Sequence, residues 1–199
     1  MSRNHAKIGK GLSLSPVASR PSDPENGDII YNSTTNAFEI YENGLWNLVG
    51  GLKSARYTLA SSQTINDNSN TTVIWNTTRH STFTTTLLNT STGRITFSEG
   101  PGVYEVQVSI GIGSSTNIAS GHRTATYIRV NGGTLRKIAG DTFEGSVFET
   151  KQWSGGDTVS VTSSSDYMDI LAYLDFGTSS YNINTVDGGV TYINIKKIS

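Results

Sequence analysis

The sequence predicts an all-β protein whose main part is a jelly-roll sandwich of about ten strands. The first observation is a strict alternation in residues 103–112, which places Tyr104, Val106, Val108, Ile110 and Ile112 on one side. The second is that runs of β-branched and aromatic residues recur at roughly 8 to 14-residue intervals between Gly, Asn and Ser turns. The third is that no segment shows the period of an amphipathic helix.

Composition excludes several classes of protein. Only 16% of the 199 residues are charged and the net charge is -1, so no strong field favours nucleic acid or an anionic membrane. Cysteine is absent, which excludes disulfides, thiol nucleophiles and zinc-thiolate sites. No apolar run reaches the roughly 20 residues of a membrane span. No hydrophobic signal core follows the basic N-terminus, so we expect a chain that is made in the cytoplasm and not exported by the usual route.

Residues 1–27 are expected to form an extended N-terminal arm. They lack apolar periodicity and contain Pro16, Pro21 and Pro24, so they cannot bury enough surface to fold by themselves. Two interpretations stay open: the arm becomes ordered on a partner, or it is a tail without fixed structure. In the first case the candidate anchoring residues are Arg3, His5, Lys7 and Lys10.

Residues 28–51 are expected to form a small β-meander. Asp28–Asn32, Ala37–Glu42 and Leu45–Leu48 are short β runs, and Asn43-Gly44 is a strong signal for a type I′ hairpin. Three short strands are too few to be stable alone, so the meander should pack on a neighbouring domain or chain. Its pattern, Gly-Asp-Ile-Ile-Tyr-Asn followed by Tyr-Glu-Asn-Gly-Leu-Trp, resembles a small β module that recurs in bacteriophage fibre and other virion proteins.

Residues 52–199 are expected to form the head. Arg94–Ser98 and Val103–Ile112, joined by the turn Glu99–Gly102, predict a hairpin at its centre. A further turn is expected at Ser154–Asp157. The other expected strands are Arg56–Leu59, Thr71–Asn76, Ser81–Thr86, Arg123–Val130, Leu135–Ile138, Thr142–Trp153, Thr158–Thr162, Met168–Phe176 and Gly189–Ile198.

Several pieces of the head together resemble the jelly roll of complement globular heads and tumour-necrosis-factor-like (TNF-like) proteins. In that family's order they are Val73–Asn76, Thr92–Phe97 with Pro101–Tyr104, Tyr127–Gly132, Gly155–Ser160 and Gly189–Ile195. The resemblance implies two five-stranded sheets and a compact homotrimer around a three-fold axis. The collagen-like stalk usual in the family is missing, which favours a viral protein over a secreted animal one.

The side-chain pattern of two strands also favours a trimer. Leu171–Asp175 and Ala125–Val130 place apolar or aromatic residues on both faces, whereas the outer face of a monomeric sandwich should be polar. Tyr127, Leu171 and Tyr173 would then be exposed in a single chain, which makes them candidates for a trimer interface. The alternative is that they are ordinary scattered surface residues.

No pattern predicts catalysis, and we expect neither an enzyme nor a bound cofactor. His5, His80 and His122 share no metal-ligand spacing. Turn and strand-edge roles, rather than the carboxylate pair of a glycosidase, account for Asp166, Asp169 and Asp175. An oxygen-rich calcium site formed by Asn66–Asn70 and Asp166 stays a candidate, because the family sometimes carries calcium near the trimer apex.

The sequence therefore predicts a structural protein of a bacteriophage virion, made in the host bacterial cytoplasm. It would be a homotrimeric fibre, spike or capsid decoration that binds other virion proteins through its arm. Host-surface adhesion, with a surface glycan as candidate partner, would use aromatic loop residues such as Tyr167 and Tyr181. Two alternatives stay open: a cement trimer that stabilises the capsid without a receptor, and a glycan-degrading tail spike.

Overall fold

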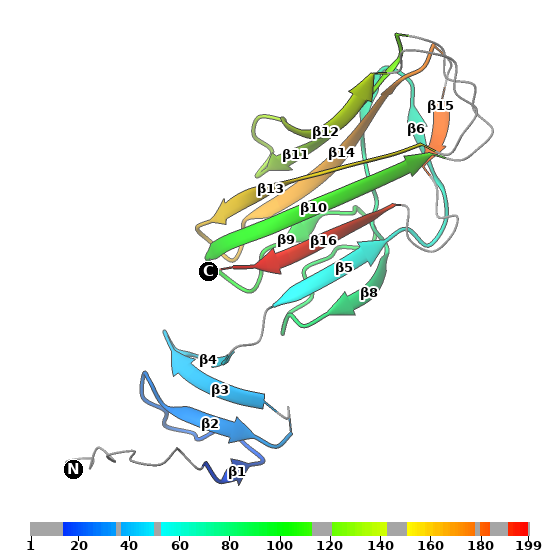
Figure 1. Cartoon of the computed structure of the whole chain (residues 1–199). Helices are drawn as coiled ribbons and strands as arrows, with labels where there is room; N and C mark the ends of the chain where they lie inside the picture. The colour runs from blue at the N-terminus through cyan, green and yellow to red at the C-terminus, as the bar shows by residue number, and fades with distance from the viewer. Residues whose placement is uncertain are drawn as a thin grey trace. The chain divides into compact units, whose positions relative to one another are not determined.

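The computed structural model describes residues 14–34, 37–49, 53–112, 121–142, 151–177, 180–183 and 191–198. The predicted anchoring residues Arg3, His5, Lys7 and Lys10 lie outside them. The chain divides into two compact units, Met1–Gly51 and Leu52–Ser199, called here the N-terminal unit and the head (Figure 1). Within the described residues all regular structure is β, and no helix there could cross a membrane.

The N-terminal unit is a four-stranded sheet in the order β1-β2-β3-β4. Its strands are β1 (Pro16–Val17), β2 (Ile29–Asn32), β3 (Ala37–Glu42) and β4 (Leu45–Leu48). The last three form the predicted meander, and Asn43 and Gly44 have φ values of 52° and 82°, as a type I′ turn requires. β1 pairs in parallel with β2, so residues 14–27 of the predicted arm join this unit.

A buried ion pair holds this arm segment to the meander. Glu39 of β3 is 1% exposed, and both its carboxylate oxygens accept hydrogen bonds from Arg20, at 2.9 and 3.1 Å. Asn32 Nδ2 donates a third hydrogen bond to Glu39, at 3.2 Å. Because a buried carboxylate is costly without partners, Arg20 fixes the segment against one face of the sheet.

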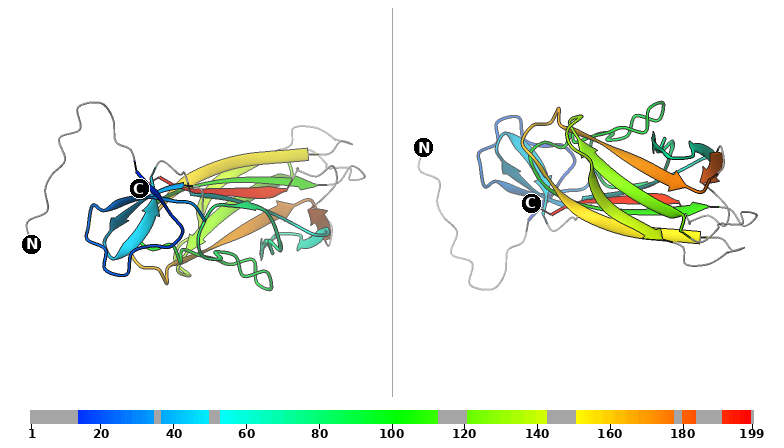
Figure 2. Two further views of the ribbon diagram at one scale, coloured as in Figure 1. Left: turned by 90° about the horizontal axis from the view of Figure 1, so that it is seen from below. Right: turned by 90° about the horizontal axis from the view of Figure 1, so that it is seen from above.

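The head is a sandwich of two sheets, which Figure 2 shows as separate layers. The larger is seven-stranded, in the order β6-β15-β10-β16-β5-β8 with β13 on the other edge of β10. The smaller is four-stranded, in the order β12-β11-β14-β9. The resemblance implies two equal sheets, whereas the described strands divide unequally because the short strands β6 and β15 extend the larger one.

The strands of the larger sheet are β5 (Ser54–Thr58), β6 (Gln63–Asn66), β8 (Thr77–Ser81), β10 (Gly102–Ile112), β13 (Lys151–Val161), β15 (Ser180–Ile183) and β16 (Tyr192–Lys197). Those of the smaller sheet are β9 (Ile95–Thr96), β11 (Arg123–Val130), β12 (Arg136–Thr142) and β14 (Tyr167–Asp175). β7 (Ser69–Thr72) and the residues around it run beside β14, where the Val73 N–H donates to the Ile170 carbonyl at 2.8 Å.

The core lies between the two sheets and confirms the predicted face of β10. Its inward side chains, Tyr104, Val106, Val108, Ile110 and Ile112, are all at most 2% exposed. The rings of Phe97 and Tyr104 pack with their centroids 4.6 Å apart. Burial of this much apolar surface, at about 25 cal/mol per Å², is the main stabilisation of the head.

The predicted hairpin at Glu99–Gly102 is wrong. β9 pairs with β14, through Ile95 opposite Met168, whereas β10 pairs with β13, β15 and β16 in the other sheet. The segment between β9 and β10 therefore crosses from one sheet to the other. Phe97 is fully buried at this crossing, so packing between the layers, rather than strand pairing, fixes it.

The predicted turn at Ser154–Asp157 is also wrong, because β13 runs through these residues without interruption. A Cβ atom on Gly155 would lie 1.9 Å from the Ile138 carbonyl oxygen, and one on Gly156 would lie 2.6 Å from that of Val106. The two glycines are therefore needed for close approach of neighbouring backbones and not for a change of direction.

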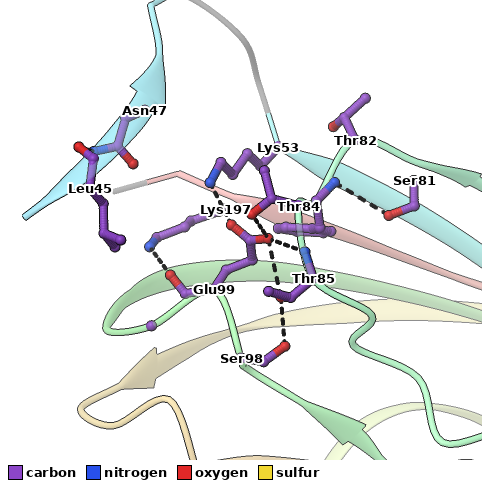
Figure 3. Close-up of polar contacts among 12 residues, drawn as sticks. Leu45, Asn47, Lys53, Ser81, Thr82, Thr84, Thr85, Ser98, Glu99 and Lys197 are labelled. Atoms are coloured by element: carbon purple, nitrogen blue, oxygen red, sulfur yellow. Dashed lines mark hydrogen bonds and ion pairs between the residues drawn. The ribbon is translucent and has the colours of Figure 1, made fainter. Parts of the chain in front are cut away.

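A buried carboxylate organises one end of the head, close to the start of β5 (Figure 3). Glu99 is 2% exposed and pairs with Lys53 at 2.5 Å, while Thr84 and the Thr85 N–H donate to its other oxygen at 2.7 Å. Burial raises the pKa of Glu99, but hydrogen bonds from Lys53, Thr84 and Thr85 outweigh it and leave the pKa below its ordinary value. Lys197 donates to the Glu99 carbonyl at 3.2 Å.

Candidate functional site: the outer face of the smaller sheet

Alternate residues of β11 and β14 point away from the core and form a surface that we call the tyrosine–arginine face. On β14 the residues between them, such as Met168 and Leu174, belong to the core cluster. The members of the face are Arg123, Ala125, Tyr127 and Arg129 from β11, Tyr167, Asp169, Leu171, Tyr173 and Asp175 from β14, and Arg94 from the residue before β9.

The register of β11 against β14 places charged pairs at two rows of this face and apolar pairs between them. Arg129 lies opposite Asp169, and Arg123 lies opposite Asp175. The two rows between these pairs hold Tyr127 opposite Leu171 and Ala125 opposite Tyr173. Directly opposite side chains in a sheet are close enough to touch, so the face is an aromatic strip bounded by ion pairs.

Asp169 is the most buried charge of the face. Its carboxylate is 4% exposed and accepts hydrogen bonds from Arg94 Nε and Nη2, at 3.0 and 3.2 Å, and from Arg129 Nη2, at 3.1 Å. The two arginines are 42% and 33% exposed, so one buried carboxylate leaves a net positive charge at the surface. The Arg94 guanidinium also lies 3.7 Å from the centre of the Tyr167 ring, a cation–π contact.

The other end of the face repeats this chemistry with weaker contacts. Arg123 Nε pairs with Asp175 at 3.2 Å, and the Arg123 guanidinium lies 5.8 Å from the centre of the Tyr173 ring. The Tyr173 hydroxyl donates to Asn68 Oδ1 at 2.5 Å, which fixes the ring. His122 Nδ1 lies 2.8 Å from the Asp175 carbonyl oxygen, so this histidine has a structural contact.

The three predicted trimer-interface residues lie on this face, but they differ in exposure. Tyr127 and Tyr173 are half-buried. The expectation that Leu171 is exposed in a single chain is wrong, because it is only 4% exposed. It lies opposite the larger Tyr127 on one side and next to the chain around β7 on the other. Leu171 therefore needs no partner chain to be buried.

The two predicted receptor residues are on different parts of the head. Tyr167 is half-buried and belongs to the tyrosine–arginine face. Tyr181 is on β15 of the larger sheet, where its ring packs edge-on against Phe176 with centroids 4.7 Å apart. Tyr167 shares a sheet face with Tyr127 and Tyr173, whereas Tyr181 belongs to the larger sheet.

The residues of the candidate calcium site do not come together. Asp67 and Asn68 contact the end of β14, where the Asp67 carboxylate accepts the Phe176 N–H at 2.7 Å. Asp166 precedes the start of the same strand and accepts hydrogen bonds from Thr162 and Ser163, at 2.8 and 3.0 Å. Among the described residues no group of three or more acidic, histidine or cysteine side chains could hold a metal ion.

A groove on the outer side of the larger sheet was not predicted. Its volume is about 330 Å³, and its polar lining is Ser54, Arg56, His80, Glu105, Gln107, Asn194 and Lys196. These residues come from β5, β8, β10 and β16, so only the strand order brings them together. Arg56 also lies over a tyrosine here, with its guanidinium 3.9 Å from the centre of the Tyr192 ring.

Comparison with known proteins shows the fold of the head. No known family profile matches the chain, and no curated protein matches it. Solved structures do match: Eiger TNF from S. frugiperda has a TM-score of 0.53 at 10% identity, and covers 74% of this chain and 93% of its own. Murine APRIL at pH 5.0 and at pH 8.0 gives TM-scores of 0.52 and 0.53 at 7% and 9% identity, covering 74% of this chain and 100% of its own.

The head is a TNF-like jelly roll. At such low identity the likeness shows the fold alone and carries no activity or partner from those proteins to this chain. It confirms the all-β sandwich expected from the strand pattern and from the resemblance.

Proposed function

We propose that the protein is a structural protein of a bacteriophage virion: a homotrimer anchored by its N-terminal region, with the jelly-roll heads directed outward. This proposal is based mainly on one observation. A TNF-like head is joined to a separate small β unit whose sequence resembles modules of phage fibres and other virion proteins. Arg3, His5, Lys7 and Lys10 would contact a neighbouring virion protein. The site of synthesis would be the cytoplasm of the bacterial host.

Within this proposal the tyrosine–arginine face is the adhesive surface and its partner is a glycan of the host surface. Tyr127, Tyr167 and Tyr173 offer aromatic surface for sugar rings, and the partly exposed guanidiniums of Arg94 and Arg129 are donors suited to sugar hydroxyls or carboxylates. Three copies in a trimer would raise the avidity of a weak site without any new contact.

The same face cannot also be covered by a neighbouring subunit. We place it outward because Leu171, its largest aliphatic side chain, is already buried in a single chain. The alternative is that Tyr127, Leu171 and Tyr173 form the trimer interface, as the sequence predicts. Tyr127→Ala separates the two: loss of glycan binding by an intact trimer supports the outward position, and dissociation of the trimer supports the interface.

The other two candidate functions have less support. A cement trimer remains the second candidate, because a TNF-like head needs no receptor to brace a capsid. A glycan-degrading tail spike would need two carboxyl groups facing a sugar, whereas Asp169 and Asp175 are each held by arginines. If the purified chain released reducing ends from host polysaccharide, that activity would support the tail-spike function.

Negative-stain imaging of virions labelled with an antibody to this chain tests the proposal. Label at one defined position on the particle supports a virion protein, and label that stays in the soluble fraction of the lysate contradicts it. Binding of the purified chain to intact host cells then separates adhesion from the cement function, which predicts no cell binding.

A further inference from the structure

The two faces of the N-terminal sheet differ in the segment that lies against them. One face carries Glu39, whose buried carboxylate is paired with Arg20, together with Ile30, Tyr41 and Trp46. The strand register places five apolar or aromatic side chains on the other face, which we call the apolar face: Ile29, Tyr31, Phe38, Ile40 and Leu45. Both faces therefore carry apolar side chains, and the arm segment is tied to the face that carries Glu39.

Three side chains of the apolar face are exposed, and the other two are half-buried. Ile29, Phe38 and Leu45 are 42%, 50% and 64% exposed, and the rings of Tyr31 and Phe38 pack edge-on at 5.1 Å. Among the described residues only six large hydrophobic side chains are exposed, and four of these belong to the N-terminal unit. This concentration of exposed apolar side chains on one small unit makes the face a candidate interaction surface.

We propose that the apolar face packs against the same face of the other copies of this chain, so that the N-terminal units associate as well as the heads. This inference rests on the trimer of the proposed function. It adds a second self-association surface, outside the jelly roll, made by residues to which the fold of the head assigns no role.

The size of the face favours other copies of the chain over a different partner protein. Three strands of about five residues cover roughly 250 Å², whereas a stable interface between separate proteins buries about 800 Å² on each side. A face this small cannot hold an independent partner. It suffices when associated heads hold the three units together, because tethering turns the contact into an intramolecular event.

The N-terminal segment before the described residues is a poor cover for this face. Residues 1–13 contain Met1, Ile8 and Leu12 as their large apolar residues and carry three positive charges without any acidic group. They would bring cationic side chains onto an aromatic and aliphatic surface, which costs desolvation.

The absence of cysteine makes a direct test possible, because a single introduced cysteine is the only thiol in the chain. Phe38→Cys and Leu45→Cys each place one on the apolar face. Ser22→Cys is the matched control, because Ser22 is exposed in the segment that Arg20 ties to the opposite face. The full-length variants are treated with a short bismaleimide at several protein concentrations, and native mass spectrometry of the untreated proteins gives their oligomeric state.

We expect Phe38→Cys, Leu45→Cys or both to form linked pairs at least tenfold faster than Ser22→Cys, at a rate independent of protein concentration. In a trimer each linked pair leaves a third chain unlinked. A trimer whose three variants react equally slowly overturns the inference and leaves the proposed trimer standing. A monomeric mass with crosslinking that rises with concentration overturns both.

Discussion

Arg94 donates two hydrogen bonds to Asp169, at 3.0 and 3.2 Å, across 75 positions of the chain. The same guanidinium covers the ring of Tyr167 at 3.7 Å. Arg94 thus joins the segment before β9 to β14, holds a buried carboxylate and fixes the orientation of a surface tyrosine. Arg94 thereby orders one end of the tyrosine–arginine face, which lowers the entropy lost when a ligand binds there.

Tyr167→Ala should weaken the binding of a single head about tenfold, since roughly 1.4 kcal/mol of lost contact corresponds to that factor, and it should weaken the binding of trimers to host cells by at least as much. The matched control is Tyr192→Ala, which removes the other tyrosine covered by an arginine, on the outer side of the larger sheet. Cell binding by labelled trimers, compared at equal trimer concentration, measures both. Equal losses in the two variants would show that the tyrosine–arginine face is not the binding surface.

Gly93→Ala should destabilise the head by about 2 kcal/mol or more. Gly93 has a φ of +71°, and a Cβ atom there would lie 2.2 Å from the Val73 carbonyl oxygen and 2.6 Å from the Ile74 Cα. The control is Gly100→Ala, where φ is +88° but no atom lies within 4 Å of the added Cβ. Urea denaturation should show a loss of about 1 kcal/mol for the control, from backbone strain alone. A Gly93→Ala variant no less stable than the control would refute the close approach.

Lys53→Met should cost about 1–3 kcal/mol, because it removes the charged partner of Glu99 and leaves that buried carboxylate with hydrogen bonds from neutral groups only. Lys137→Met, at an exposed lysine of β12, is the control and should change the free energy of unfolding by less than about 0.5 kcal/mol. Denaturation monitored by tryptophan fluorescence gives both values. If the two variants are equally stable, the ion pair contributes nothing measurable.

The Glu99 carboxylate also predicts how stability changes with pH. Its pKa in the folded head lies below the ordinary value of 4.5, so its contribution is fully present above pH 4.5 and is lost as the pH falls through the lower, folded pKa. Glu99→Gln should therefore be less stable than the wild type near neutral pH and lose less stability between about pH 5 and pH 3. If the free energies of unfolding of the two proteins fell in parallel as the pH is lowered, Glu99 would not be the source of this pH dependence.

Local patterns predicted β10 and the meander well, because each depends on a period of two and on turn residues close in sequence. Local patterns failed where contacts between segments that are distant in sequence determine the strand pairing. The pairing of Ile95 with Met168 separates β9 from β10, and the close approach of the Ile138 and Val106 carbonyls explains Gly155 and Gly156 without a turn.

The candidate site was predicted only in part for the same reason. Alternation along Leu171–Asp175 placed Leu171 and Tyr173 on one side, whereas Tyr167 was expected in a loop and lies on β14. The partners of Asp169 were not visible, because Arg94 and Arg129 reach it from other strands. The burial of Leu171 likewise depends on the chain around β7, which no local pattern places beside β14.

The trimer is the claim on which adhesion, avidity and the association of the N-terminal units all depend. Native mass spectrometry of the full-length protein at low micromolar concentration tests it most directly. We predict a single species of about 64 kDa, three times the 21.4 kDa of one chain. A species that stays at 21.4 kDa across the accessible concentration range would contradict it.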